Sequence, residues 1–256
     1  MPSSTSSRAS SEPALAATGL TGPRGAPTVH DVNLVVPRAA TRLVLGAIHA
    51  GKSMVLRHLV GLECAAAGRI TIAGELFDPT SNSPTAVRRM QTRIGVLFES
   101  SALISRISVV DNVELPMLEH TGATRGEARD AARELLAEVG VPSDDDVTPV
   151  QLGRSDRRRV ALARAVALRP PIVLMDEPTH GLDAGSAAAL DDTVARLQER
   201  HGFGVLIFSR EVRHAFGPAS HIYVMRDGRI VASGDRDTLG RSDDPAVHQL
   251  FHRRGD

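Results

Sequence analysis

The chain has 256 residues, of which 42% are hydrophobic and 23% are charged, proportions that are typical of globular domains. Lys and Arg number 30 together, and so do Asp and Glu, so the formal net charge is zero. Nucleic-acid binding driven by overall charge needs a basic surplus, so this balance argues against a nucleic-acid partner. The single cysteine, Cys64, excludes an internal disulfide.

Residues 1–28 differ in composition from the rest of the chain. They are rich in Ser, Thr, Ala, Pro and Gly and hold no aromatic side chain. Such a segment buries too little apolar surface to offset the entropy lost on ordering, so we expect a disordered tail. The tail has no apolar core for a secretory signal, and no apolar run of the chain approaches the roughly 18–20 residues that span a bilayer. These features predict a cytoplasmic protein.

Strand and helix patterns alternate along the rest of the chain. Buried or edge strands are predicted at 31–37, 41–46, 68–77, 93–98, 171–178 and 204–209. Helices are predicted at 51–62, 122–140, 155–168 and 184–202, within a pattern that is mainly helical from about 108 to 165. A hairpin over 221–234 has Asp227-Gly228 as its turn. This alternation implies a mainly parallel sheet with helices on its faces.

The helix over 155–168 opens in a run of four arginines between Arg154 and Arg159. Ser155 or Asp156 is the expected N-cap of this helix. Gly140 and Gly202 stand where the C-caps of the helices before them belong. Because the net charge is zero, the arginine run is a local feature of the chain.

The sharpest motif is GAIHAGKS, Gly46–Ser53, which fits the phosphate-loop pattern G-x-x-x-x-G-K-S. It follows a predicted strand and opens a predicted helix, which is the context that the motif requires. Backbone N–H groups of such a loop hold phosphate oxygens. Lys52 is placed to reach the β- and γ-phosphates, and the Ser53 hydroxyl to ligate Mg²⁺.

A second motif, IVLMDEP, ends a buried strand in Asp176 and Glu177. In a phosphate-loop enzyme the first acid serves Mg²⁺ through water, and a following carboxylate orients or deprotonates the attacking water. A strand that merely ends in acids is common. Both motifs together, on neighbouring parallel strands, favour a nucleotide triphosphate site.

With these motifs in order, the chain resembles the nucleotide-binding subunit of an ABC transporter over about residues 29–252. The resemblance implies an α/β fold, a P-loop NTPase ABC ATPase domain with a mainly parallel core sheet, an N-terminal antiparallel β region and a helical subdomain. The nucleotide-binding domain would span 29–240, with its helical subdomain at about 105–165 and a C-terminal extension at 241–256. More narrowly, LFESSALI, MRDGRIVASG and SDDPAVHQLFHRR are similar to the ATPases of Mce/Mla-type lipid importers.

The family's functional residues are carried over by matching motifs. The Walker A loop implies these ATP-binding residues: Gly46, Ala47, Ile48, His49, Ala50, Gly51, Lys52, Ser53 and Met54. Walker B implies Glu177 as the catalytic base, and the switch segment FSRE adds Arg210 as a catalytic residue. The implied Mg²⁺ ligands are Ser53, Asp176 and, from the Q-loop, Glu99. The signature LGRSD would contribute Gly153, Arg154 and Ser155 to the partner's ATP site in trans. The D-loop would contribute Asp183.

Four of these positions depart from the family pattern. Glu99 replaces a Gln, which is either a tolerated near-isosteric change or a negative charge near the γ-phosphate. Arg210 replaces a His and either contacts the γ-phosphate as an arginine finger or turns away, with slow hydrolysis. In the signature, Gly153 lacks a serine hydroxyl and Arg154 stands where a glycine lets the backbone approach. We expect Arg154 to crowd the dimer site, the other outcome being that its charge replaces the lost donors.

The aromatic residue on which such ATPases stack adenine is missing. Tyr223 is the only Tyr, Trp is absent, and no Phe precedes Phe77. We therefore expect base stacking to be weak or absent, with affinity carried by the phosphate contacts. His49 inside the phosphate loop is expected to be solvated.

The main hypothesis is an ATP-binding subunit, with ATP and Mg²⁺ as cofactors, that energises transport of a lipid or other hydrophobic substrate. It would work as a homodimer or heterodimer with permease subunits, in the cytoplasm and peripheral on the inner face of the cell membrane. The alternative is an ATP-binding partner subunit in a heterodimer that hydrolyses weakly or not at all. An ABC-like protein acting on DNA or ribosomes is disfavoured, because the chain has no coiled-coil insertion and no tandem domain.

Overall fold

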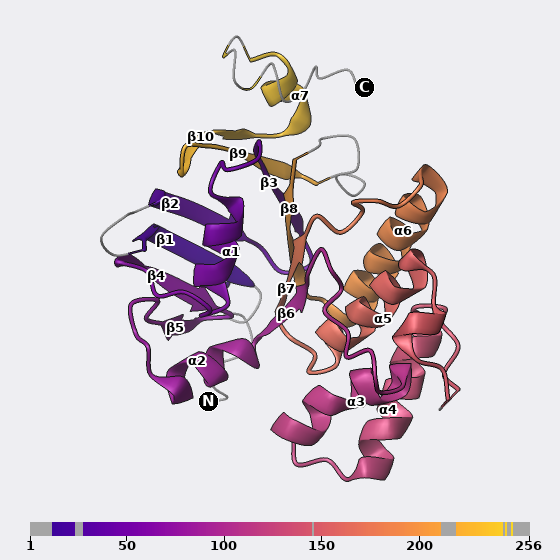
Figure 1. Ribbon diagram of the computed structural model, residues 1–256. Helices are drawn as coiled ribbons and strands as arrows, with labels where there is room; N and C mark the ends of the chain where they lie inside the picture. Colours follow the sequence, from indigo (N-terminus) through magenta and orange to yellow (C-terminus); the bar gives the residue numbers. More distant parts are fainter. Residues whose placement is uncertain are drawn as a thin grey trace, which may run out of the picture.

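The computed structural model describes residues 12–23, 28–144, 146–210, 219–242, 244 and 247, and it contains two sheets with helices around them (Figure 1). The larger sheet has the strand order β10-β9-β3-β8-β7-β6. Strands β9, β3, β8, β7 and β6 run parallel, and β10 pairs antiparallel with β9. The prediction of a mainly parallel core sheet is confirmed. Its strands are β3 (Thr41–Leu45), β6 (Ile94–Leu97), β7 (Ile172–Asp176), β8 (Gly204–Ser209), β9 (His221–Arg226) and β10 (Arg229–Gly234).

The smaller sheet is antiparallel and has the order β2-β1-β4-β5. It consists of β1 (Leu15–Gly22), β2 (Val29–Val36), β4 (Ala67–Ile72) and β5 (Glu75–Phe77). The predicted strand over 68–77 is in fact two strands, because Ala73 and Gly74 have positive φ and turn the chain. The expected antiparallel β region is confirmed, and it includes a strand that the sequence did not predict.

Strand β1 corrects the prediction of a disordered tail over residues 1–28. It lies between β2 and β4, so its backbone groups pair on both sides, and Leu15, Ala17 and Leu20 are buried. The composition of the segment does not reveal this strand. A few buried apolar side chains suffice to order it, because its backbone pairs with neighbouring strands on both sides. Residues 1–11 and 24–27 lie outside the described residues.

Helices cover both faces of the larger sheet (Figure 1). Strand β3 directs Leu43 and Leu45 into a core shared with α3–α6, and Val44 into a second core shared with α1 and the antiparallel sheet. The alternation of side chains along a strand explains how one strand serves both cores. The helices are α1 (Lys52–Leu59), α2 (Pro84–Gln91), α3 (Val109–His120), α4 (Arg125–Glu138), α5 (Arg154–Val166), α6 (Ala184–His201) and α7 (Arg236–Gly240), with a 3₁₀ turn η1 (Pro149–Gln151).

The helix boundaries confirm some predicted caps and correct others. Gly202 caps α6 with φ 72°, as predicted, and the hairpin turn lies at Asp227-Gly228. Helix α5 begins at Arg154 with Gly153 as its N-cap, so neither Ser155 nor Asp156 caps it. The extended backbone at Gly153 lets the helix start one residue before the first side chain suited to capping. Helix α2 was not predicted.

Helices α3, α4 and α5 pack together at one end of the molecule, in the range where a helical subdomain was predicted (Figure 1). Of the C-terminal extension predicted at 241–256, all but residues 241, 242, 244 and 247 lie outside the described residues. Within the described ranges, no helix combines the length and the apolar character that a membrane crossing needs.

Asp191 on α6 carries an electrostatic prediction for stability. Burial, followed by the neighbouring Asp192, raises the pKa of Asp191 to about 7. Its Oδ1 atom is buried without a hydrogen-bond partner among the described residues. A carboxyl whose pKa is higher in the folded than in the unfolded protein favours folding at low pH, and that contribution is lost as the pH rises through about 7.

We expect Asp191→Asn to leave the free energy of unfolding nearly unchanged near pH 4 and to raise it by roughly 1–2 kcal/mol near pH 8, after allowance for solvent screening. Chemical denaturation at both pH values checks this. Glu199→Gln is the matched control, because Glu199 is an exposed acid on the same helix. A stabilisation of Asp191→Asn that is equal at both pH values would contradict the electrostatic explanation.

Candidate functional site

A loop between β3 and α1 forms one wall of the site. Its first residue, Gly46, donates its N–H to the Ser209 carbonyl of β8 at 3.2 Å, which extends the sheet pairing into the loop. At the other end Gly51 has φ 106° and caps α1 without a side-chain hydrogen bond from any described residue. The first N–H groups of α1 are therefore left to a ligand, which is how a helix N-terminus binds phosphate.

Two glycines of this loop are required by close contacts with neighbouring backbone. A Cβ on Gly46 would lie 2.6 Å from the Met225 carbonyl oxygen. A Cβ on Gly51 would lie 2.8 Å from the Met225 side chain and 3.1 Å from the Thr28 carbonyl oxygen, in addition to the strain of its positive φ. The hairpin turn also donates the Gly228 N–H to the Ala50 carbonyl at 2.9 Å. The β9–β10 turn thus fixes the loop from behind.

Lys52 is buried at the start of α1 and is held by its own loop. Its Nζ donates to the carbonyl oxygens of Gly46 and Ala47, at 2.7 and 3.0 Å. Burial lowers the pKa of Lys52, opposed by Glu177 and Asp176 and reinforced by Arg210. The ammonium group therefore faces two carboxylates across the site and is positioned to receive anionic oxygens.

The acids predicted from IVLMDEP form the opposite wall. Asp176 ends β7, and burial raises its pKa, with further increases from the charges of Glu177 and Glu99 that Lys52 and Arg210 partly offset. Glu177 is 9% exposed and has φ 43°, a conformation that a non-glycine residue adopts at a cost of about 1–3 kcal/mol. Its N–H donates to the Phe208 carbonyl at 2.9 Å, which holds the strained residue at the sheet edge.

Arg210, directly after β8, bonds to the predicted catalytic base. Its Nε donates to Glu177 Oε1 at 2.9 Å, and the Ser209 hydroxyl donates to Glu177 Oε2 at 3.3 Å. One Arg210 amino group donates to His180 Nδ1 at 3.3 Å and lies 3.9 Å from Glu99 Oε1. Arg210 therefore turns into the site, where its charge offsets that of Glu177.

These walls enclose a cavity of about 460 Å³. It brings together seven of the predicted phosphate-loop residues, the acids and Arg210, whereas Gly46 and Ala47 are not among its described lining residues. The predicted Mg²⁺ ligands Ser53, Asp176 and Glu99 all face it, and their oxygen donors suit Mg²⁺ together with substrate phosphates. The lining consists of Thr28, Ile48, His49, Ala50, Gly51, Lys52, Ser53, Met54, Glu99, Asp176, Glu177 and Arg210.

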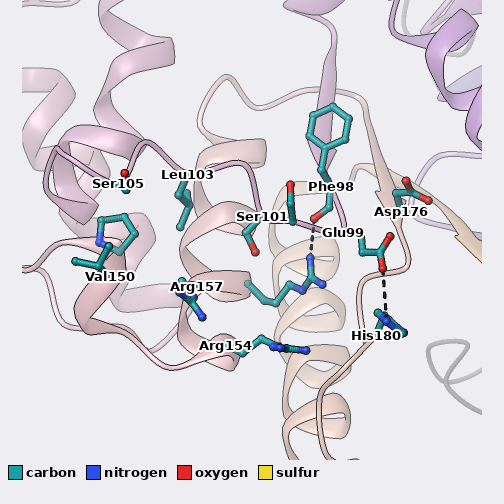
Figure 2. A pocket seen from close by; sticks show the side chains of 13 residues that line it. Phe98, Glu99, Ser101, Leu103, Ser105, Val150, Arg154, Arg157, Asp176 and His180 are labelled. Carbon is teal, nitrogen blue, oxygen red and sulfur yellow. Dashed lines mark hydrogen bonds and ion pairs between the residues drawn. The ribbon is translucent and has the colours of Figure 1, made fainter.

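A second cavity, of about 730 Å³, lies between the sheet edge and α5 and shares Glu99 and Asp176 with the first (Figure 2). Arg154 lines this second cavity and is not among the described residues that line the first. Its guanidinium donates to the Gly181 carbonyl at 3.2 Å, so the side chain folds onto the turn before α6. Gly153, Arg154 and Ser155 are thus separate from the ATP-binding residues within this chain.

Three other predicted residues have defined surroundings. Asp183 caps α6 and accepts the Ser186 N–H at 2.9 Å, and its hydrogen bonds with Ser186 lower its pKa. The Tyr223 hydroxyl donates to the Val35 carbonyl at 3.0 Å and accepts its N–H, so this ring belongs to the fold. His49 is exposed, with φ 66°, as expected for a solvated side chain.

Sequence reasoning missed two residues of the site, Ser209 and His180. Ser209 was inside a predicted strand, and only the pairing of β8 with β7 brings it to Glu177. His180 points toward Glu99, with its Nε2 at 3.6 Å from Glu99 Oε1 (Figure 2). It also accepts a hydrogen bond from Arg210. The one feature of the sequence that could have indicated His180 is its position, three residues after Glu177.

The comparisons with known proteins agree with this geometry. Residues 29–180 match the model of the ABC transporter family. The chain is 32% identical over 237 residues to the "Probable ribonucleotide transport ATP-binding protein mkl" of Mycobacterium tuberculosis, which covers 92% of this chain and 66% of that protein. It is 32% identical over 228 residues to the arginine transport ATP-binding protein ArtP of Haemophilus influenzae, which covers 88% of this chain and 92% of that protein.

Among solved structures, the ATP-binding cassette MJ0796, a dimer in a post-hydrolysis state bound to ADP and Pi, aligns with a TM-score of 0.75. The alignment has 26% sequence identity and covers 86% of this chain and 98% of that chain. The chain spans about two thirds of the length of the mycobacterial mkl relative, at 66%. The family match over more than half of the residues and the shared architecture lead to one conclusion: the chain belongs to the ABC transporter family and has the fold of its ATP-binding cassette.

Proposed function

We propose that the chain is the ATP-hydrolysing subunit of an ABC transporter and acts as a dimer beneath a membrane permease, on the inner face of the cell membrane. The observation that carries this proposal is the cavity that joins the phosphate loop to Lys52, Asp176 and Glu177. The shift of the Asp176 pKa by burial and by Glu177 is of the kind found in functional clefts.

Each residue has a distinct role in this proposal. ATP phosphates would replace the Gly46 and Ala47 carbonyl oxygens as partners of Lys52, because an ammonium binds a phosphate oxygen more strongly than a neutral carbonyl. Glu177 would then position and deprotonate the attacking water. Mg²⁺, held through Ser53 and Asp176, would neutralise charge between the phosphates. The strained backbone at Glu177 fixes its direction before ATP arrives.

The dimer in this proposal places the N-terminus of α5 over the ATP of the partner subunit. Helix α5 begins without a side-chain cap from the described part of the chain, so its first N–H groups are available to a γ-phosphate. Arg154 bonds to Gly181 of its own chain, which keeps the guanidinium beside this surface. That contact supports a role in which Arg154 adds positive charge next to the helix end, in contrast to the expected crowding.

The proposed cargo is a lipid or another hydrophobic substrate. It rests on the similarity of LFESSALI, MRDGRIVASG and SDDPAVHQLFHRR to the ATPases of Mce/Mla-type importers. The curated relatives are named for ribonucleotide and arginine transport, so the cargo of this chain is proposed from the resemblance alone.

Hydrolysis tests the proposed function. We expect Glu177→Gln to lower the steady-state ATPase rate at least about 100-fold, because general-base catalysis contributes about 10²–10⁴-fold. The variant should still bind ATP, since the phosphate loop and Lys52 are intact. Phosphate release by the purified chain measures the rate, and Glu134→Gln is the matched control because Glu134 is exposed on α4.

Two results of this experiment would overturn parts of the proposal. An ATPase rate that Glu177→Gln leaves unchanged would overturn the role of Glu177, because another group would then be the base. A wild-type chain that binds ATP but hydrolyses it only when mixed with an intact paralogue would instead identify the non-hydrolysing partner of a heterodimer.

The phosphate loop gives a second prediction. We expect Gly51→Ala to weaken ATP binding at least about tenfold and to lower the free energy of unfolding by about 1–3 kcal/mol, because alanine is strained at φ 106° and its Cβ meets Met225 and Thr28. Nucleotide titration and chemical denaturation check both effects. Gly126→Ala on α4 is the control, because no described atom lies within 4 Å of its Cβ, and it should be neutral or stabilising. If Gly51→Ala and Gly126→Ala had the same ATP affinity and stability, the requirement for glycine at position 51 would be contradicted.

The signature gives a third prediction. Gly153 has φ −64° and open space around a Cβ among the described residues, so Gly153→Ser fits without strain. The added hydroxyl is a donor for the partner's γ-phosphate at each of the two sites of a homodimer, so we expect ATP-dependent dimerisation to strengthen about 25-fold, the effect of two hydrogen bonds of roughly 1 kcal/mol each. Light scattering in the Glu177→Gln background measures dimerisation, with Lys52→Ala as the variant that should not dimerise. Unchanged or weaker dimerisation in Gly153→Ser would contradict the trans site.

A further inference from the structure

Four side chains from four segments meet where the two cavities adjoin: Glu99, Glu177 and Arg210 line the first cavity, and Glu99 and His180 line the second. Glu99 follows β6, Glu177 follows β7, His180 lies in the turn before α6, and Arg210 follows β8. Arg210 is central to the group, since it contacts Glu177 at 2.9 Å and His180 at 3.3 Å and lies 3.9 Å from Glu99. His180 is not among the residues carried over from the family.

The hydrogen-bond directions fix the arrangement of this group. An arginine side chain only donates, so the His180 Nδ1 that faces Arg210 carries the lone pair. The ring proton is then on Nε2, which lies 3.6 Å from Glu99 Oε1. His180 therefore accepts a hydrogen bond from Arg210 on one side and, on the other, places a polar N–H near the carboxylate of Glu99.

The charges of the group cancel in pairs. The family pattern has a Gln at position 99 and a His at position 210. Compared with these residues in their neutral forms, Glu99 adds one negative charge and Arg210 adds one positive charge. Without Arg210, Lys52 alone would balance Glu99, Asp176 and Glu177 around the cavity, as far as its described lining goes. Three carboxylates and one lysine would then leave an excess of two negative charges beside the terminal phosphate of ATP. Arg210 reduces that excess, so the charge that Glu99 adds is compensated by the charge that Arg210 adds.

The contacts of His180 and Glu99 within this group do little for the stability of the fold. The side chains of His180 and Glu99 are 53% and 47% exposed, and that of Arg210 is 32% exposed. Ion pairs as open to water as these contribute little to folding. Their effect is stronger once a nucleotide excludes water from the cavity, because a lower dielectric strengthens each interaction.

We propose that Glu99, His180 and Arg210 form a charge-compensated unit that sets the preference of the site for ATP over ADP. Arg210 is the group that faces the γ-phosphate, and Glu99 and His180 are positioning residues that hold it. Arg210 contacts Glu177, which in the proposed function positions the water that attacks the terminal phosphate, so the unit belongs to the part of the site where ATP and ADP differ. The inference rests on the proposed function, because it requires a site that binds ATP.

A double-mutant cycle tests the pairing of Glu99 with Arg210. The affinities of fluorescent N-methylanthraniloyl ATP and ADP are measured without Mg²⁺, so that loss of a Glu99 metal contact does not enter. We expect Arg210→Gln to weaken ATP binding about tenfold and ADP binding less than about twofold, as loss of one charge-assisted hydrogen bond predicts. In the Glu99→Gln background, the ATP penalty of Arg210→Gln should fall to about threefold or less. Arg210→Lys keeps the charge and should retain most of the preference.

His180 variants test the positioning role. A glutamine accepts a hydrogen bond through its oxygen and donates through its nitrogen, so His180→Gln can keep both contacts. We expect His180→Ala to lower the ratio of ATP to ADP affinity about threefold to fivefold, the effect of one lost hydrogen bond, and His180→Gln to restore it. The melting temperatures of both variants should match that of the wild type, which separates positioning from a structural role.

Each outcome decides between explanations. Equal penalties of Arg210→Gln in the wild-type and Glu99→Gln backgrounds would overturn the unit while leaving the proposed function intact. Equal loss of ATP and ADP affinity with a lower melting temperature would assign these residues a structural role and also overturn the unit. A wild-type chain that binds neither nucleotide, and a Lys52→Ala variant that behaves identically, would overturn the proposed function and the unit with it.

Discussion

The site depends on the register of three neighbouring parallel strands. Pairing of Leu45 with Ser209, and of Asp176 with Phe208, brings the ends of β3, β8 and β7 to one edge of the sheet. Two hydrogen bonds extend this ladder beyond the strands, from Gly46 to the Ser209 carbonyl and from Glu177 to the Phe208 carbonyl. The phosphate loop and Glu177, the proposed base, are thus fixed to the same central strand. A slip of one residue in β8 would break both bonds and turn every side chain of the strand to the opposite face.

Burial is the largest cause of the shifted pKa values of Lys52 and Asp176 in the site. Lys52 and Asp176 are both removed from water, which disfavours the charged form of each, and each partly restores the other. Arg210 adds a positive charge beside Glu177 and forms an ion pair with it. A site arranged in this way favours an anionic ligand that can bring its own cation. That is the chemistry of a nucleotide triphosphate with Mg²⁺.

The sequence predicts the local parts of this arrangement and misses the parts made by distant segments. The phosphate loop and the pair Asp176–Glu177 are recognisable because their chemistry needs fixed spacing within one stretch of chain. Strand β1 was missed because its order comes from pairing with β2 and β4, which composition does not record. The place of His180 was missed for a similar reason, since its partners Glu99 and Arg210 are 81 and 30 residues away in sequence.

The arginines at the start of α5 bind backbone beside both Glu99 and His180, which are distant from each other in sequence. Arg158 donates to the Phe98 carbonyl at 2.6 Å, directly before Glu99, and burial lowers its pKa. Arg154 donates to the Gly181 carbonyl at 3.2 Å, directly after His180. One helix therefore binds the backbone next to Glu99 and next to His180, the two residues that position Arg210. Any displacement of α5 relative to the sheet must move Glu99 and His180 or break these two bonds. The geometry thus links the position of the helical region to the charge that faces the γ-phosphate.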